Sequence, residues 1–106
     1  MVIVIARLTQ KIRPGMWDEL DKIDKQFTEI ENKLGYPPKK RYRALLGGNP
    51  IDTLIIDREW KSLAEMEKVM TKGVLDEDYQ KLSSKLDDII EWARYEIFVP
   101  HPPFPE

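Results

Sequence analysis

The stretch RYRALLGGNPIDTLIIDREW, residues 41–60, holds two strand patterns that flank a turn. Residues 41–46 alternate in polarity, and residues 53–60 are rich in the β-branched side chains that strands favour. Between them, Gly47-Gly48-Asn49-Pro50 has the composition of a turn. The stretch therefore predicts an antiparallel hairpin, with a loop of several residues, in the middle of the chain.

A long amphipathic helix is predicted before this hairpin. Its apolar residues recur every three or four positions, with charged residues filling the positions between them. This spacing indicates a helix with one apolar stripe, which would pack on a sheet. Gly35 and the two prolines at 37–38 are expected to end it. The stripe consists of Met16, Leu20, Ile23, Phe27, Ile30 and Leu34.

Two shorter helices are predicted after the hairpin. Ser62 is the expected N-cap of the first helix, with Glu65 as its capping-box partner. Gly73 is expected to end that helix, and Asp76 is the expected N-cap of the next one.

The two ends of the chain supply the remaining strands. Residues 2–8 (VIVIARL) and 93–99 (ARYEIFV) are short runs of the kind that form strands. The order of elements is β-α-β-β-α-β, and right-handed crossovers place the helices on one face of a four-stranded antiparallel sheet. We therefore predict a ferredoxin-like α+β domain over residues 1–99, followed by a proline-rich tail over residues 100–106.

The composition of the chain argues against several classes of function. The 106 residues carry a net charge of −2 and no cysteine, which argues against nucleic-acid binding and excludes thiolate chemistry. The one histidine, His101, lies between prolines without an acid or base partner, so we expect no metal site and no bound cofactor. The apolar run at residues 1–6 is too short to cross a membrane, and no signal-peptide pattern follows it. A cytoplasmic location without membrane contact is expected.

Both faces of the predicted sheet carry apolar side chains. The helices cover one face, yet Ile3, Ile5, Ile55, Trp92 and Phe98 fall on the other by the alternation of strand residues. A sheet that is apolar on both faces needs a second cover, and the chain offers no further element. We therefore expect a homodimer in which two sheets close into a barrel.

Three stretches resemble the dimeric α/β-barrel superfamily: residues 2–8, the helix entry Arg13-Pro14-Gly15, and residues 55–62 (IIDREWKS). Within it, the chain is similar to small antibiotic-biosynthesis-monooxygenase-like and NIPSNAP-like proteins. The resemblance implies the ferredoxin-like fold and places the chain among cofactor-free oxygenases, haem-degrading enzymes, isomerases, pathway proteins and binding proteins. Relatives that oxidise substrates often carry a histidine shortly after the tryptophan, whereas residues 63–70 contain none. The resemblance therefore does not extend to haem ligation or histidine-based catalysis.

Charged residues inside the predicted strands are the candidate site residues. Burying a charge is costly without a partner, so each must reach solvent, form an ion pair or line a wet cavity. Ion pairs between strands on an exposed surface are one interpretation. The other is a cavity in which Arg58 and Arg94 stabilise an anion. Arg43 and Ile56 would contact the ligand there.

Three further side chains complete the candidate site. Trp60 ends its strand, where it would stack on a planar ligand or, alternatively, plug the junction of sheet and helices as a core residue. Tyr42 or Glu96 would serve proton transfer, although strand tyrosines more often simply pack.

These features predict a protein that binds or transforms a planar small molecule, acidic or aromatic, without a tightly bound cofactor. As an enzyme it would be a cofactor-independent monooxygenase, isomerase or cyclase in a secondary-metabolite (pigment or polyketide) or degradative pathway. The alternative is a non-catalytic binding or assembly protein whose sheet face is only a dimer interface. A polar-tipped cavity of a few hundred Å³ enclosed by the dimer favours the first prediction, and filling of that space by facing side chains favours the second.

Overall fold

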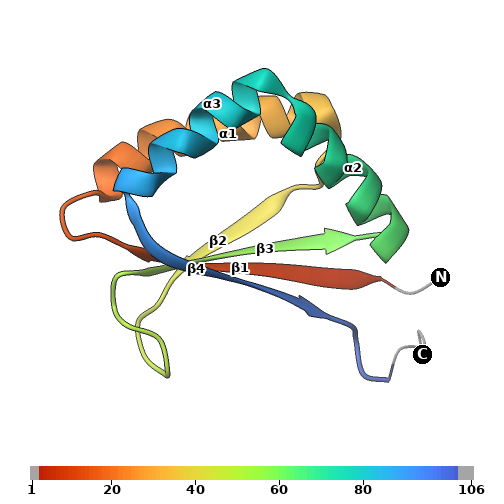
Figure 1. Cartoon of the computed structure of the whole chain (residues 1–106). Coiled ribbons are helices and arrows are strands. Elements are labelled where there is room, and N and C mark those ends of the chain that lie inside the picture. Colours follow the sequence, from red (N-terminus) through yellow and green to blue (C-terminus); the bar gives the residue numbers. More distant parts are fainter. Residues whose placement is uncertain (1–2, 103–106) are drawn as a thin grey trace.

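A computed structural model describes residues 3–102 of the chain (Figure 1). The elements follow the predicted order. They are β1 (Val4–Ile12), α1 (Trp17–Leu34), β2 (Lys39–Arg43), β3 (Thr53–Trp60), α2 (Leu63–Leu75), α3 (Glu77–Lys85), the 3-10 turn η1 (Leu86–Asp88) and β4 (Ile90–Phe98).

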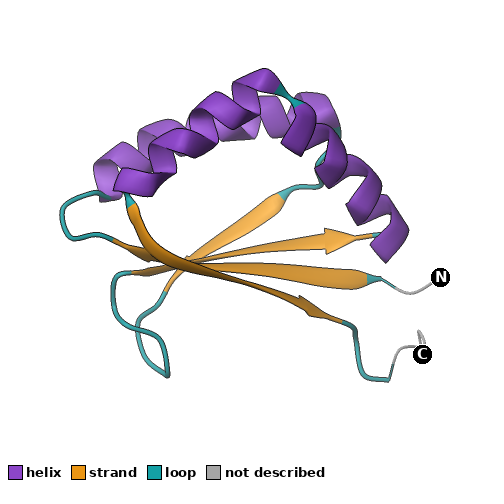
Figure 2. Ribbon diagram, in the orientation of Figure 1, coloured by secondary structure: helices purple, strands orange, loops and turns teal. Residues whose placement is uncertain are grey.

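The four strands form one antiparallel sheet in the order β2-β3-β1-β4. The helices all lie on one side of this sheet, as Figure 2 shows. We call that side the helix face and the other side the open face. This two-layer arrangement is the ferredoxin-like α+β fold that the sequence predicts.

Side-chain caps fix where the helices after the hairpin begin. The Ser62 hydroxyl accepts a hydrogen bond from the backbone N–H of Glu65 at 3.1 Å, and Asp76 accepts one from the N–H of Tyr79 at 2.8 Å. Both predicted N-caps are confirmed. The prediction that Gly73 ends α2 is wrong, because the helix continues past it to Leu75.

The strands differ from their predicted bounds mainly through β1. This strand continues to Ile12 instead of ending at Leu8, because it lies between β3 and β4 and pairs with both over its polar second half. Its longer pairing moves the start of β4 forward to Ile90. Strand β2 spans Lys39–Arg43 rather than residues 41–46.

Two clusters of buried side chains fill the space between the layers. The first gathers where β1 ends and α1 begins, and the second where β3 ends and α2 begins. The first contains Ile12, Leu20, Ile23, Phe27, Leu54, Leu82 and Ile89. The second contains Val4, Ala6, Tyr36, Trp60, Met66 and Val69.

The open face combines apolar side chains with a central ion pair. Ile3, Trp92 and Phe98 each expose more than a third of their surface, as expected for a face that no helix covers. Between the apolar positions, Arg7 donates two hydrogen bonds of 2.9 Å to the carboxylate of Asp57. This interaction raises the pKa of the Arg7 guanidinium. The open face is therefore less uniformly apolar than the sequence pattern suggests.

The loop between β2 and β3, residues 44–52, bends toward the side of the sheet opposite the helices (Figure 1). The side-chain oxygen of Asn49 accepts a hydrogen bond from Arg94 Nη2 at 3.4 Å, which links the loop to β4. Thr9 and Thr53 point to the open face and are nevertheless almost fully buried.

The proline-rich tail is only partly described. Residues 100–102 form no helix or strand. Residues 103–106 lie outside the described part of the chain, so the division into a domain over residues 1–99 and a tail stays a prediction.

Candidate functional site

A cavity of about 110 Å³ lies between the helices and the sheet. Its volume approaches that of an engineered protein cavity of about 150 Å³ that takes up benzene. Most of its lining is apolar, so a hydrophobic ring would be well accommodated. The apolar lining residues are Ala6, Leu8, Leu20, Phe27, Leu54, Ile56, Met70 and Leu86.

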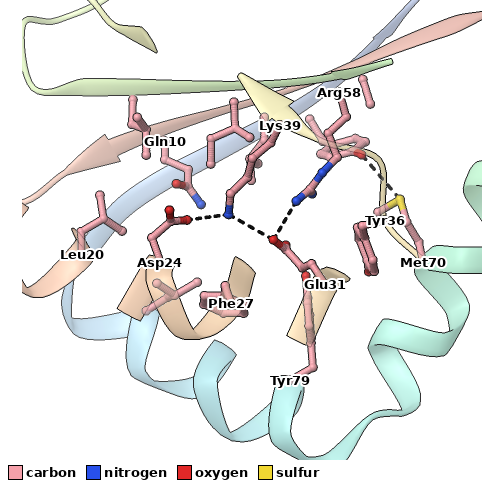
Figure 3. A pocket seen from close by; sticks show the side chains of 16 residues that line it. Gln10, Leu20, Asp24, Phe27, Glu31, Tyr36, Lys39, Arg58, Met70 and Tyr79 are labelled. Carbon is pink, nitrogen blue, oxygen red and sulfur yellow. Dashed lines mark hydrogen bonds and ion pairs between the residues drawn. The ribbon is translucent and has the colours of Figure 1, made fainter. Parts of the chain in front are cut away.

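Four charged side chains meet on the wall of this cavity, and Figure 3 shows them in contact. Lys39 Nζ lies 2.6 Å from Oδ1 of Asp24 and 3.0 Å from Oε1 of Glu31. Arg58 Nη2 lies 2.7 Å from the same oxygen of Glu31. We call Asp24, Glu31, Lys39 and Arg58 the ion cluster. None of its side chains exposes more than 16% of its surface, so water screens these attractions weakly.

The local fold explains why these four side chains meet. Asp24 and Glu31 are two helical turns apart on α1, so their carboxylates project from the same side of the helix. Lys39 and Arg58 are opposite one another on β2 and β3, so both cations project from the helix face. Arg58 is also held by a hydrogen bond of 3.2 Å from its Nε to the carbonyl of Pro37.

The ion cluster also lines a second hollow, an open groove on the outer side of α1 and β2. Asp24, Glu31, Lys39 and Arg58 line both this groove and the inner cavity. Arg41 lines only the groove and lies 3.5 Å from Asp24. The cluster therefore forms part of the wall between the two hollows.

Three tyrosines complete the polar lining of the cavity: Tyr36, Tyr79 and Tyr95. Burial is the main cause that raises the pKa of each phenol, and the negative charge of Glu31 adds to this effect for Tyr36 and Tyr79. The three hydroxyls therefore remain protonated at neutral pH and act as hydrogen-bond donors.

Tyr95 marks the side on which the cavity meets solvent, because it lines the cavity and is 46% exposed. Its hydroxyl lies 3.5 Å from the sulfur of Met70, a contact drawn in Figure 3. A thioether is a weak acceptor, so an oxygen atom of a ligand would be a better partner for this hydroxyl.

The structure brings two of the predicted site residues into the cavity lining: Arg58 and Ile56. Arg58 does not present a free guanidinium group there, because it is paired with Glu31. Trp60 is 2% exposed and packs in the second core cluster, as the alternative interpretation of this residue expects. Arg43 stacks on the ring of Trp17 at 4.1 Å and does not line the cavity.

The other three predicted residues, Arg94, Tyr42 and Glu96, project from the open face. The expectation that Arg58 and Arg94 converge on one anion is therefore wrong. Even-numbered residues of β1 pair with even-numbered residues of β3 but with odd-numbered residues of β4, so the two arginines point to opposite sides of the sheet. Arg94 forms an exposed ion pair with Glu96 at 3.2 Å.

Several cavity residues were not singled out from the sequence. A usable signal for the ion cluster is a pair of acids seven positions apart beside the apolar stripe of α1, followed by a lysine after two prolines. The sequence does not identify Gln10 as a site residue, because the predicted first strand ends at Leu8 and Gln10 follows it. The residues are Gln10, Asp24, Glu31, Lys39 and Tyr79.

Residues 3–102 contain neither a metal-ligand cluster nor a membrane-spanning helix. No group of three or more acidic or histidine side chains in this range is arranged to hold a metal ion. None of the helices in the same range has the length and apolar character needed to cross a membrane.

The chain shares its fold with several solved structures, whereas comparisons of its sequence find no match. No family model matches the chain, and no curated protein matches it by sequence. A NIPSNAP family protein from Agrobacterium tumefaciens superposes with a TM-score of 0.80 at 21% identity, over 93% of this chain and 86% of that one. A NIPSNAP domain protein from Burkholderia xenovorans gives 0.79 at 13% identity, over 97% and 99% of the two chains.

A functionally described structure with the same fold is SnoaB, a cofactor-independent oxygenase from Streptomyces nogalater. It superposes with a TM-score of 0.69 at 8% identity, over the full length of both chains. These similarities confirm the ferredoxin-like fold and its resemblance to the NIPSNAP-like and monooxygenase-like proteins. At such low identity they concern the fold and leave the function open.

Proposed function

We propose that this protein binds a planar, ring-sized organic molecule in the cavity between the helices and the sheet. The observation that supports this is the cavity itself, which combines an apolar lining with a few buried polar groups. Gln10, which is 6% exposed, and the three protonated tyrosines supply hydrogen bonds that would orient the ring.

The proposal extends to chemistry without a tightly bound cofactor, in a secondary-metabolite or degradative pathway. A fold shared with a cofactor-independent oxygenase supports this extension by analogy. The tyrosine nearest to solvent, Tyr95, is the side chain best placed to give a hydrogen bond or a proton to a ligand oxygen. Tyr42, the tyrosine singled out from the sequence, projects from the open face instead.

The test is to measure the binding of phenol and related single-ring compounds. Chemical-shift changes and thermal stabilisation of the protein report the binding. Phenol is expected to perturb residues that line the cavity, such as Leu54 and Phe27. Tyr95→Phe should weaken binding by roughly fivefold to tenfold, the value of about one hydrogen bond. The matched control is Tyr42→Phe, since Tyr42 is similarly exposed on the opposite face. If no single-ring compound binds, or if both variants weaken binding equally, the proposed site is wrong.

We also propose that the open faces of two copies pack together as a homodimer. Apolar side chains that are exposed on this face support the proposal: Ile3, Tyr42, Trp92 and Phe98. The central pair of Arg7 and Asp57 is already satisfied within one chain, so it would enter the interface without an unpaired charge.

Sedimentation should then report about twice the chain mass of 12.5 kDa. Phe98→Glu is expected to yield monomers because it places a charge in the interface. Ile97→Glu is the matched control, since Ile97 is the preceding residue, is similarly exposed and faces the other way. A wild-type monomer at micromolar concentration would contradict the proposal.

A non-catalytic assembly protein is the second candidate function, and the exposed apolar open face favours it. The two candidate functions differ in whether the cavity binds a ligand. If ring compounds never enter the cavity while the dimer forms as proposed, the assembly function is the one that remains.

A further inference from the structure

The charges around the cavity are balanced within the ion cluster, and Arg41, which lies 3.5 Å from Asp24 on the groove side, has its own partner in Asp21 at 3.2 Å. Among the residues that line the cavity, Asp24 and Glu31 carry negative charge and Lys39 and Arg58 carry positive charge. Each cation lies within 3.0 Å of a carboxylate oxygen, and Glu31 receives both cations on one oxygen. A ligand in the cavity would therefore meet charges that already have partners.

The burial of the cluster makes this balance matter for binding. Glu31 and Lys39 expose only 8% and 10% of their side chains. A charge brought beside them is poorly screened and would have no counter-charge of its own. A charged ligand that sought a partner here would have to break an existing pair and leave one of its charges buried without a partner, which is strongly unfavourable.

The remaining polar groups of the cavity are uncharged. Gln10 supplies an amide, and Tyr36, Tyr79 and Tyr95 supply phenolic hydroxyls. Gln10 reaches the cavity from β1, whereas Leu20 reaches it from α1, and both are labelled in Figure 3. These groups suit an oxygen atom of a neutral molecule, such as a phenol, a quinone or an aromatic ketone.

We infer that the ion cluster makes the cavity selective for uncharged ring compounds, which excludes the aromatic acids that a free Arg58 would favour. This inference rests on the proposed binding function and specifies the charge of its ligand. The cluster acts through its zero net charge, so Glu31 and Lys39 are specificity-determining residues whose replacement should change the preferred charge in a predictable direction.

The experiment compares three probes of similar size at neutral pH: phenol, benzoate and benzylammonium. Wild-type protein should bind phenol at least about tenfold more tightly than either ion, a difference of about 1.4 kcal/mol. Glu31→Gln leaves the cluster with one excess positive charge and should improve benzoate binding about tenfold. Lys39→Met leaves one excess negative charge and should improve benzylammonium binding by a similar factor.

Two substitutions on the opposite face serve as matched controls. Glu59→Gln and Lys40→Met make the same changes in net charge at exposed positions of the open face. They should leave the order of the three probes unchanged. If they shift it as the cluster variants do, the effect comes from overall charge and the inference is wrong.

The wild-type measurement can overturn the inference even if a cluster variant does not fold, and Glu31→Gln and Lys39→Met test the cluster independently of one another. If wild-type protein binds benzoate as tightly as phenol, the charge-selection inference is overturned while the binding function stands. If none of the three probes binds, the proposed function itself fails. If phenol binds best and Glu31→Gln folds but gains no benzoate affinity, the ion cluster does not set the preference.

Discussion

Gly73 shows how much a single missing side chain can decide. A Cβ atom at this position would overlap the hydroxyl oxygen of Tyr36, whose ring is buried against α2. Alanine would ordinarily stabilise a helix interior by about 1 kcal/mol relative to glycine. Because of the overlap, alanine at position 73 should destabilise the fold instead. Gly73 therefore leaves room for Tyr36, which lines the cavity. The sequence alone predicted only that a helix ends at this glycine.

We predict that Gly73→Ala lowers the free energy of unfolding by about 1–3 kcal/mol, the usual cost of overpacking. Tyr36→Phe removes the oxygen atom that the added methyl group would overlap and leaves ring carbons at 3.2 Å and 3.4 Å, so Gly73→Ala in that background should cost clearly less than in the wild type. Urea unfolding of the four proteins of this cycle measures the coupling. Additive effects of the two substitutions would show that the Tyr36 hydroxyl is not what excludes a side chain at position 73.

Two of the strand arginines singled out from the sequence, Arg58 and Arg94, should behave differently. Arg58→Ala leaves the buried Glu31 with Lys39 as its one cation, and we expect a loss of about 1–3 kcal/mol of stability. Arg94→Ala removes an exposed pair with Glu96 and should change stability by less than about 1 kcal/mol. Chemical denaturation of both variants checks this, and equal effects would contradict the burial argument.

The helices after the hairpin depend on their caps. Asp76 both follows α2 and caps α3, so its carboxylate fixes the point where one helix gives way to the next. We predict that Asp76→Ala lowers stability by about 1 kcal/mol through loss of this cap. Asp78→Ala, two positions along in the same first turn, is the control and should cost less. Thermal unfolding that ranks Asp78→Ala as the more damaging change would refute the assignment.

The strands explain which parts of the fold and site the sequence could predict. The bounds of β3 and the caps at Ser62 and Asp76 depend on local chemistry, and the predictions for them hold. The faces of Arg58 and Arg94 depend on how β1 pairs with both neighbours, which no local pattern encodes. The cavity was missed for a similar reason, since Gln10 and Glu31 meet only through tertiary packing.

The fold as a whole should lose stability in alkaline solution. The folded protein raises the pKa of Tyr36, mainly through burial, above the value of about 10 that an unfolded chain gives a tyrosine. Above that pH the unfolded chain releases the proton and the folded chain keeps it, so the free energy of unfolding falls as pH rises.

Unfolding measured from about pH 8 to about pH 11 should therefore show a decline that Tyr36→Phe makes shallower. The difference between the two proteins carries the result, because the other titratable groups are the same in both. Tyr42→Phe, on the open face, should leave the decline of the wild type nearly unchanged. Identical slopes for Tyr36→Phe and wild type would contradict the role given to burial.

The place of β1 in the sheet has a consequence for synthesis on the ribosome. This strand is made first, yet its neighbours are β3 and β4, the last of which ends at Phe98. The central hydrogen bonds of the sheet therefore join segments made far apart in time, and such distant contacts slow folding. Until β4 emerges, one edge of an apolar strand stays unpaired in the nascent chain, where a chaperone or a neighbouring nascent chain could bind it.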